Sequence, residues 1–429
     1  MRPTLFYVPH TFLGIPVLGL GWALALLVLG IVGYVATSRK RQSIGKILEE
    51  QGIMWAVAAC IIVFLLPQIE TRIDDGTPQG FNVGLPVRGY GVMLMLGVLS
   101  ALGIALYRCK RAGISQESFF SLATWVVLSG LLGARIFYVV QKWDELAGES
   151  ITDKLWTAIK VTEGGLVVYG SVIGGLIAML VWCQRNRMPI IPIADSITPA
   201  FFIGLAFGRL GCLLNGCCYG GVCELPLPSI AFPAGSPAYM DQLASGRLLG
   251  MGTDKVPTVA EPQPIQSVAS HSWASDNKIQ IGERLVSVRE MMVAGPTPST
   301  PMSDPVFQAE VKVDGRRFQV PSVDVPPRSV PVHPSQVYAA ISGLLLCGWT
   351  LLLAENTKRN GVVFGSGLIA YGVLRIIEEI IRVDEAGQFG TSLSIAQWIS
   401  IAGIACGFAL IVQAYLRKPK ENPVPHPAV

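Results

Sequence analysis

The stretch GRLGCLLNGCCYG, residues 208–220, gathers an arginine, glycines and thiols directly after a long apolar run. Arg209 can donate two parallel hydrogen bonds to a phosphate, because its guanidinium is a planar fork. Glycines at positions 208, 211, 216 and 220 let a ligand or a neighbouring helix approach the backbone closely. This combination favours a site for an anionic headgroup over simple packing of Arg209 against the membrane surface.

Further ionisable residues lie inside apolar segments, where a charge is costly and therefore indicates function. Arg375 and Glu379 are spaced i, i+4 and share one helix face, either as a structural ion pair or as part of a polar site. Arg135 lies near one end of its segment, where it can contact a ligand or extend to the surface. His333 is the one histidine beside an apolar run.

The cysteines are scattered apart from Cys212, Cys217, Cys218 and Cys223. Three alternatives remain open for this group: a disulfide that braces the turn, packing thiols, and a metal site or redox relay. The C-x4-C-C-x4-C spacing does not match common zinc sites, and no C-x-x-C pair is present.

The elements that position these residues are predicted to be membrane helices. The chain of 429 residues is 51% apolar and 14% charged, whereas a soluble domain has about 25% charge. The net charge of +4 gives no basis for nucleic-acid binding. Most of the apolar runs reach the ~20 residues that a spanning helix needs. The runs cover residues 13–36, 53–67, 89–107, 119–140, 165–183, 193–215, 335–354, 362–382 and 394–415.

The loops between these runs predict the orientation. Lys and Arg follow the first, third, fifth, seventh and ninth runs, so these loops are expected in the cytoplasm. The first run is too long for a signal-peptide core and is predicted to be retained. Nine spans then place the N-terminus outside and the C-terminus inside.

A long outer loop, 221–332, is predicted to hold a small β-rich insertion. Residues 278–288 and 309–320 alternate apolar and polar side chains, and Asp314-Gly315 is a hairpin turn signal. Residues 297–305 are typical of a flexible linker.

Several stretches, in the same order, resemble the prolipoprotein diacylglyceryl transferase family. Its signature G-R-x-G-N-F-x-N-x-E-x-x-G corresponds to residues 208–220, and its H-P-S-Q-L-Y-E corresponds to HPSQVYA, 333–339. Its Y-G-L-M, G-G-R-I-G-Y-V, D-G-G-M-S-F-H-G-G and R-x-x-x-E motifs resemble residues 90–93, 133–139, 163–171 and 375–379. The resemblance covers about 85–415 without the outer loop.

The resemblance implies a core of seven helices, with the first two spans as an N-terminal addition. It also implies transfer of the diacylglyceryl group of phosphatidylglycerol to the lipobox cysteine of a prolipoprotein that still carries its signal peptide. Glycerol phosphate leaves, and no metal or other cofactor is needed. A location in the bacterial cytoplasmic (inner) membrane follows.

The resemblance also suggests roles for individual residues. Arg209 and Arg375 would neutralise the leaving phosphate, Glu379 would orient Arg375, and Tyr90 and His333 would handle protons or hydrogen bonds. Arg135, Gly208, Gly211, Asn215, Gly220 and Gln336 complete the expected substrate site. The family's Asn, Glu and His are replaced by Cys212, Cys217 and Tyr169. A tyrosine is a weak base at neutral pH unless its environment lowers its pKa. Tyr169 therefore stays a catalytic candidate beside three alternatives: the family's histidine is dispensable, another group does its work, or the chemistry has changed.

The expected organisation is therefore 1–84 (two N-terminal spans), 85–220 and 333–415 (catalytic core), 221–332 (outer insertion) and 416–429 (cytoplasmic tail). Two competing functions remain. One is a non-catalytic relative that binds an anionic lipid or a soft metal. The other is a membrane thiol oxidoreductase that uses the cysteine cluster.

Overall fold

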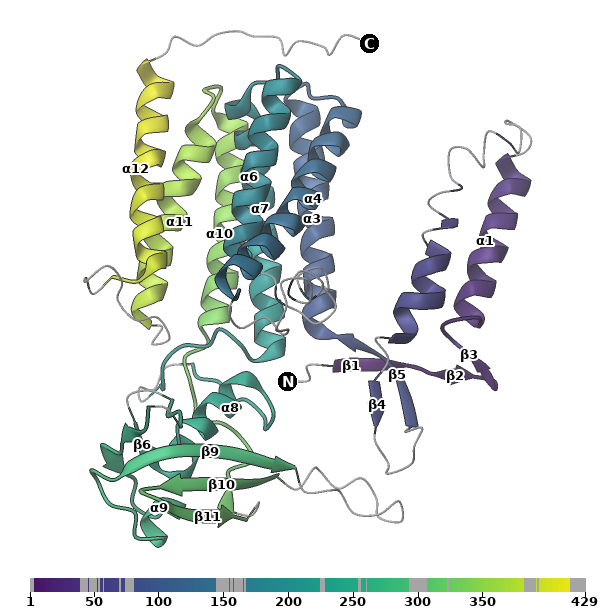
Figure 1. The fold of residues 1–429 in the computed structure, drawn as a ribbon. Coiled ribbons are helices and arrows are strands. Elements are labelled where there is room, and N and C mark those ends of the chain that lie inside the picture. The colour runs from purple at the N-terminus through teal and green to yellow at the C-terminus, as the bar shows by residue number, and fades with distance from the viewer. Residues whose placement is uncertain are drawn as a thin grey trace. The chain divides into compact units, whose positions relative to one another are not determined.

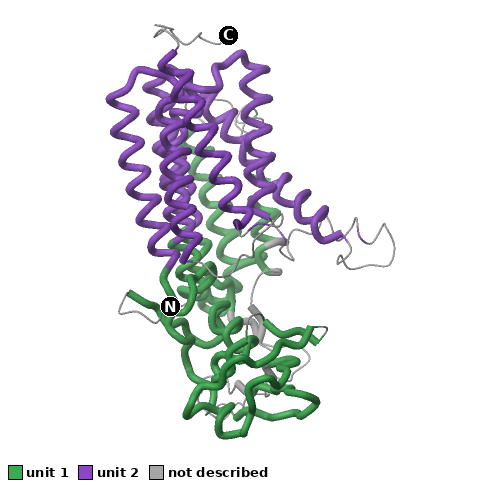
Figure 2. Tube along the Cα trace, turned by 90° about the vertical axis from the view of Figure 1, so that its left-hand side faces the viewer, with its two compact units in different colours: residues 1–93, 210–334 green, residues 94–209, 335–429 purple. Residues whose placement is uncertain are grey.

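The computed structural model divides the chain into two compact units. One contains residues 1–93 and 210–334, and the other contains residues 94–209 and 335–429 (Figure 2). The residues described are 4–38, 45, 52, 55–56, 58–68, 71–73, 81–143, 154, 157, 165, 167–223, 228–253, 256–259, 261–292, 307–321, 324–381, 391 and 393–416. The charged loop 39–44, the linker 297–305 and the tail beyond Leu416 lie outside them.

Long apolar helices make up the second unit (Figure 1). Within the described residues, six helices are long and apolar enough to cross a membrane. They are α3 (Gly89–Arg111), α4 (Gln116–Gln141), α6 (Val168–Arg185), α7 (Ile190–Asn215), α10 (Ser335–Asn356) and α12 (Ile395–Leu416). The chain is therefore a multi-pass membrane protein.

Helix α11 (Val362–Ile381) is also long enough to span a membrane. It is not counted among the six apolar helices because it contains three charged residues, Arg375, Glu378 and Glu379. It packs against α12 through glycines. A Cβ atom added to Gly365 would lie 2.8 Å from the carbonyl oxygen of Gly407. In the same way α4 packs against α6, where a Cβ on Gly133 would lie 2.4 Å from the Gly170 carbonyl oxygen. Small residues thus allow close helix packing without a hydrophobic driving force.

The N-terminal segment differs from the predicted spans. The first predicted run, 13–36, is helical only from Trp22, in α1 (Trp22–Ser38), because its earlier residues form β3 (Ile15–Pro16) and turns. The predicted run 53–67 is irregular over its described part, with a π-helix (Ile61–Leu65) and a 3₁₀ turn (Leu66–Gln68). Residues 53–54 and 57 lie outside the described residues.

Short strands accompany these helices in the first unit. They are β1 (Thr4–Pro9), β2 (Thr11–Phe12), β4 (Thr71–Ile73) and β5 (Phe81–Arg88). β5 pairs antiparallel with both β1 and β4, and β2 pairs with β3. The chain enters α3 directly from β5.

The segment between α7 and α10 contains a four-stranded sheet in the order β11-β10-β9-β7. Its strands are β7 (Gln263–Pro264), β9 (Arg284–Met292), β10 (Phe307–Val313) and β11 (Arg316–Val320). Smaller elements are α8 (Pro237–Ala244), a 3₁₀ turn (Arg247–Leu249), the pair β6 (Met251–Gly252) and β8 (Ser267–Val268), and α9 (Trp273–Asp276).

The β10–β11 hairpin turns at the predicted position. Asp314 and Gly315 both have positive φ, 44° and 78°, as a two-residue type I′ turn requires. Val311 and Val313 of β10 and Leu285 of β9 are buried in a core shared with α8 and α9. The strand predicted over 278–288 begins only at Arg284, because the preceding residues form turns.

Candidate functional site

Arg375 and Glu379 form an ion pair on α11, inside the helical unit. Arg375 Nη1 lies 2.5 Å from Glu379 Oε2, and only 11% and 5% of the two side chains are exposed. The pair lacks hydrogen-bond geometry, and Glu379 Oε1 is buried without a hydrogen-bond partner among the described residues. The charges therefore compensate each other, while one carboxylate oxygen remains available to a further donor.

Arg209 of α7 lines a small cavity with residues of α10 and α11. The other lining residues are Leu205, Ala339, Ser342, Leu346, Tyr371, Leu374 and Glu378. The cavity of about 10 Å³ is no larger than a single water molecule needs. A cation, a carboxylate and two hydroxyl groups thus meet among apolar side chains, and a larger ligand requires side-chain movement.

Of the residues that line this cavity, only Arg209 belongs to the predicted site, and the two hydroxyl groups that the prediction missed are those of Tyr371 and Ser342. Tyr371 precedes Arg375 by four residues, so the two lie on the same face of α11. Tyr371 could have been predicted from the sequence, because its hydroxyl group lies one helical turn from a charged residue in an apolar helix. Ser342 lies one turn beyond Tyr338 on α10 and has no comparable signal.

Arg135 is buried in α4 and contacts backbone carbonyl groups. Its Nη1 donates to the Gly165 oxygen at 3.0 Å and its Nη2 donates to the Thr157 oxygen at 2.8 Å. Its guanidinium also lies over the Tyr138 ring, 5.2 Å from the centroid. These contacts support a role in holding the segment between α4 and α6. A contact of Arg135 with phosphate stays a prediction.

Asp195 is an ionisable residue of α7 that is not part of the predicted site. It accepts hydrogen bonds from the backbone N–H groups of Gly361, at 2.6 Å, and Phe364, at 2.7 Å. These groups belong to the N-terminus of α11, whose first N–H groups have no partner within the helix. Asp195 therefore fixes the start of the helix that carries Arg375 and Glu379.

The other unit contains the remainder of the signature. Helix α7 ends in a Schellman motif: the N–H of Cys217 donates to the Cys212 oxygen at 3.1 Å, and Gly216 adopts φ of 76°. One turn earlier, a Cβ on Gly211 would lie 3.0 Å from the Tyr90 ring. The sequence thus needs glycine at 216 for the turn and at 211 for close packing of Tyr90.

Beyond the helix, the signature turn is hydrogen-bonded to the segment that carries His333. The N–H of Gly220 donates to the His333 oxygen, and the N–H of His333 donates to the Gly221 oxygen, both at 2.9 Å. The N–H of Cys223 donates to the Pro331 oxygen at 3.0 Å. Nδ1 of His333 is buried and has no hydrogen-bond partner among the described residues. The imidazole is therefore held on a fixed backbone with one nitrogen unsatisfied.

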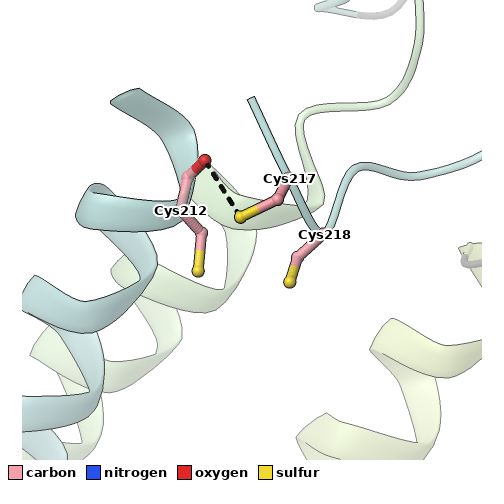
Figure 3. A group of neighbouring side chains, drawn as sticks. All are labelled: Cys212, Cys217 and Cys218. Carbon is pink, nitrogen blue, oxygen red and sulfur yellow. Dashed lines mark hydrogen bonds between the residues drawn. The ribbon is translucent and has the colours of Figure 1, made fainter. Parts of the chain in front are cut away.

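Three thiols gather at the end of α7 (Figure 3). The sulfur atoms of Cys212, Cys217 and Cys218 all lie within 4.8 Å of one another, and Cys223 is not part of this group. None of the cysteines, all of which lie in described segments, forms a disulfide. The pKa of Cys217 is raised: its hydrogen bond with Cys212 lowers the value, but its hydrogen bond with Cys218 and its burial outweigh that effect.

The remaining predicted residues are distributed over both units. In the helical unit, Tyr169 is the second residue of α6 and is exposed, and Gln336 is fully buried near the start of α10. A Cβ on Gly208 would meet no atom within 4 Å. In the other unit, Asn215 is the last residue of α7 and Gly220 is buried.

A set of apolar helices that encloses an ion pair and an arginine-lined cavity is typical of a membrane protein that holds charged groups among its spanning helices. The family model for prolipoprotein diacylglyceryl transferase matches residues 78–413. The chain therefore belongs to the prolipoprotein diacylglyceryl transferase family, a family of membrane transferases.

Individual bacterial relatives agree with this assignment. A phosphatidylglycerol–prolipoprotein diacylglyceryl transferase of Rhodopirellula baltica is 38% identical, over 97% of this chain and 89% of its own length. Enzymes of the same name from Clostridium tetani and Bdellovibrio bacteriovorus are 24% and 25% identical, each over 76% of this chain and over 92% and 88% of their own lengths.

Proposed function

We infer that the chain transfers the diacylglyceryl group of phosphatidylglycerol to the lipobox cysteine of a prolipoprotein and releases glycerol phosphate. The observation that carries this inference is the buried charge in a chain of this family. Arg209 lines a cavity among apolar helices, and Arg375 is paired with Glu379 on α11. These groups suit a substrate whose phosphate must leave from within the membrane.

The transfer forms a carbon–sulfur bond and breaks a carbon–oxygen bond. The acceptor thiol loses its proton, and the thiolate attacks the glyceryl carbon that carries the phosphate ester. The bonding electrons depart with the phosphate oxygen, so negative charge grows on the leaving group. A fixed cation near that oxygen stabilises the transition state more than the ground state.

Arg209 is proposed as that cation, because its guanidinium matches two phosphate oxygens. Arg375 is proposed as a second cation, held in place by Glu379. Tyr371 and Ser342 lie at the same cavity as Arg209 and are added as hydrogen-bond donors. Gly208 supports this proposal, since its open side leaves space for a ligand against the α7 backbone.

Proton transfer is proposed for residues outside this cavity. His333 is the leading candidate, because its buried Nδ1 is unsatisfied and an imidazole nitrogen can accept or donate a proton. Tyr90 and Tyr169 are retained as hydrogen-bonding groups. Arg135, Gly211, Asn215, Gly220 and Gln336 stay proposed substrate-site residues, with structural contacts for Arg135 and Gly211 as described above.

The proposal includes a topology. Nine spans, with two added before a core of seven, would place the N-terminus and the insertion 221–332 outside and the C-terminus in the cytoplasm. The core would comprise 85–220 and 333–415. The acceptor would then arrive from the outer side while its signal peptide is still in the membrane. The basic loops, of which Arg108 and Arg111 at the end of α3 are part, support this orientation.

A transfer assay tests the function. The purified protein is given phosphatidylglycerol with labelled acyl chains and a lipobox peptide with one cysteine. We expect label on the peptide with the natural chain, loss of more than about 100-fold with Arg209→Ala, and partial activity with Arg209→Lys. Arg111→Ala is the matched control, because Arg111 is an exposed arginine paired with Glu355.

The competing functions give different results. A natural chain that binds phosphatidylglycerol vesicles without labelling the peptide would be a lipid-binding relative and would contradict the transferase. Transfer that survives Arg209→Ala would remove this arginine from the mechanism. Dependence of the activity on all clustered thiols, with disulfide exchange in the peptide, would favour the oxidoreductase.

A further inference from the structure

The thiol group at the end of α7 has no role in the proposed transfer. Cys212 belongs to the last turn of the helix, Cys217 makes the closing hydrogen bond of the Schellman motif, and Cys218 follows it. Cys217 Sγ also donates a weak hydrogen bond to the Cys212 oxygen at 3.8 Å. The helix end folds back so that residues five and six positions apart present their sulfur atoms to one region (Figure 3).

We propose that Cys212, Cys217 and Cys218 form a three-thiolate site for one soft closed-shell metal ion, of the class of Cu⁺ and Zn²⁺. This site goes beyond the transferase reaction and does not depend on it. Soft thiolate ligands select such ions over hard cations such as Mg²⁺ and Ca²⁺.

The distances fit a metal better than a covalent bond. The sulfur atoms lie within 4.8 Å of one another. With metal–sulfur bonds of about 2.3 Å, a trigonal site separates its sulfur atoms by about 4.0 Å. A disulfide instead requires about 2.05 Å between two of them and leaves the third thiol unused. A small inward movement of each side chain therefore completes the metal site.

The ligand number narrows the choice of ion. No fourth cysteine, histidine or carboxylate belongs to the group within the part of the chain that the structure describes. Cu⁺ is stable with three thiolates, whereas Zn²⁺ completes four positions and would need a water molecule. The three thiols are half-buried, so an ion can enter while part of its surroundings excludes water.

The backbone of Cys218 is an independent observation. Its φ is 57°, in the left-handed region that glycine and asparagine occupy more easily than other residues. The next but one residue before it, Gly216, already supplies the positive φ that ends the helix. The unfavourable conformation at Cys218 is therefore not needed for the helix end, and it points the third sulfur toward the region of the other two (Figure 3).

Binding changes protonation and leaves oxidation states unaltered. Three S–H groups lose their protons, three sulfur lone pairs bond the ion, and the protons pass to solvent. The bound ion joins the end of α7 to the turn whose later residues, Gly220 and Gly221, are hydrogen-bonded to His333. The site is thus placed to fix the geometry of the signature turn.

Protection from alkylation tests the site on the natural full-length chain. The protein is purified in detergent with a non-thiol reductant and without oxygen, and is then titrated with Cu⁺ or with Cd²⁺ as a spectroscopic probe. Mass spectrometry follows alkylation of each cysteine. We expect one equivalent of either ion to slow alkylation of Cys212, Cys217 and Cys218 together by at least tenfold, with no change from Mg²⁺.

Exposed Cys60 and Cys406 are internal controls whose alkylation should not change. In a second measurement, Cys217→Ser should weaken binding more than tenfold, whereas Cys406→Ser should leave it unchanged. Equal alkylation rates of the three thiols with and without the ion would overturn the proposal, whatever the variants do. So would a disulfide between two of them in protein isolated without oxygen.

Discussion

Substitutions of Arg375 and Glu379 should have strongly non-additive effects on the free energy of unfolding. The two side chains are 11% and 5% exposed, and their nearest atoms are 2.5 Å apart. With charge centres about 4 Å apart and an effective dielectric constant of about 20, the attraction is about 4 kcal/mol. Glu379→Leu leaves a buried arginine without its counter-charge, and we expect it to reduce the free energy of unfolding by about 3–5 kcal/mol. Arg375→Met should have a similar effect.

The double variant distinguishes ion pairing from simple loss of packing. Together, Arg375→Met and Glu379→Leu remove both charges and fill the site with apolar groups, so the stability should return to within about 1 kcal/mol of the natural chain. The exposed pair Arg111–Glu355 is the matched control, because Glu355→Leu should cost at most about 1 kcal/mol.

The measurement is equilibrium unfolding in mixed detergent micelles, followed by circular dichroism at several denaturing-detergent fractions. If the double variant lost as much free energy of unfolding as the two single variants together, the coupling between the charges would be refuted. A stable double variant that also retained transfer would refute the role of Arg375 in binding the leaving group. We expect stability without transfer.

Three further predictions follow from local geometry. Gly211→Ala should lower the free energy of unfolding by about 1–3 kcal/mol and reduce transfer, because its Cβ would lie 3.0 Å from the Tyr90 ring. Gly208→Ala, whose Cβ would enter open space, should be neutral or stabilising by up to about 1 kcal/mol in the same unfolding assay. Asp195→Ala should cost about 2 kcal/mol and Asp195→Asn less than half of that, since the asparagine oxygen still caps α11; equal losses would exclude capping. In metal-free protein, Cys218→Gly should be about 1 kcal/mol more stable than Cys218→Ala, because glycine adopts the positive φ of this position more easily. Equal stabilities of the two variants would show that the backbone there is unstrained. In a separate titration, neither variant should bind the metal ion.

Sequence reasoning succeeded where one residue determines a local conformation. The Asp314-Gly315 turn and the apolar segments of the central helices follow directly from residue type and periodicity. It was wrong at the start of the first apolar run. Apolar composition continues through residues 13–21, but strand β3 and the following turns delay the helix to Trp22.

The charged residues of the candidate site could be predicted from the sequence, whereas the uncharged residues that contact the same cavity were not. Arg209, Arg375 and Glu379 are visible because ionisable residues are rare in apolar helices. The cavity partners Ser342 and Tyr371 are ordinary residues of membrane helices, and only the packing of α7, α10 and α11 brings them to Arg209. Likewise, the sequence shows four clustered cysteines, whereas the helix end selects three of them.

The hydrogen bonds between the signature turn and the His333 segment also act as a clasp at the base of the insertion. After α7 the chain passes through residues 220–223 into the insertion and returns through residues 331–333, and these two segments pair directly. The hydrogen bonds between the two ends offset the entropic cost of closing this long loop. That cost rises only slowly with loop length. The residues between the ends can therefore lengthen, shorten or exchange one small domain for another while the register of the helices on either side is preserved.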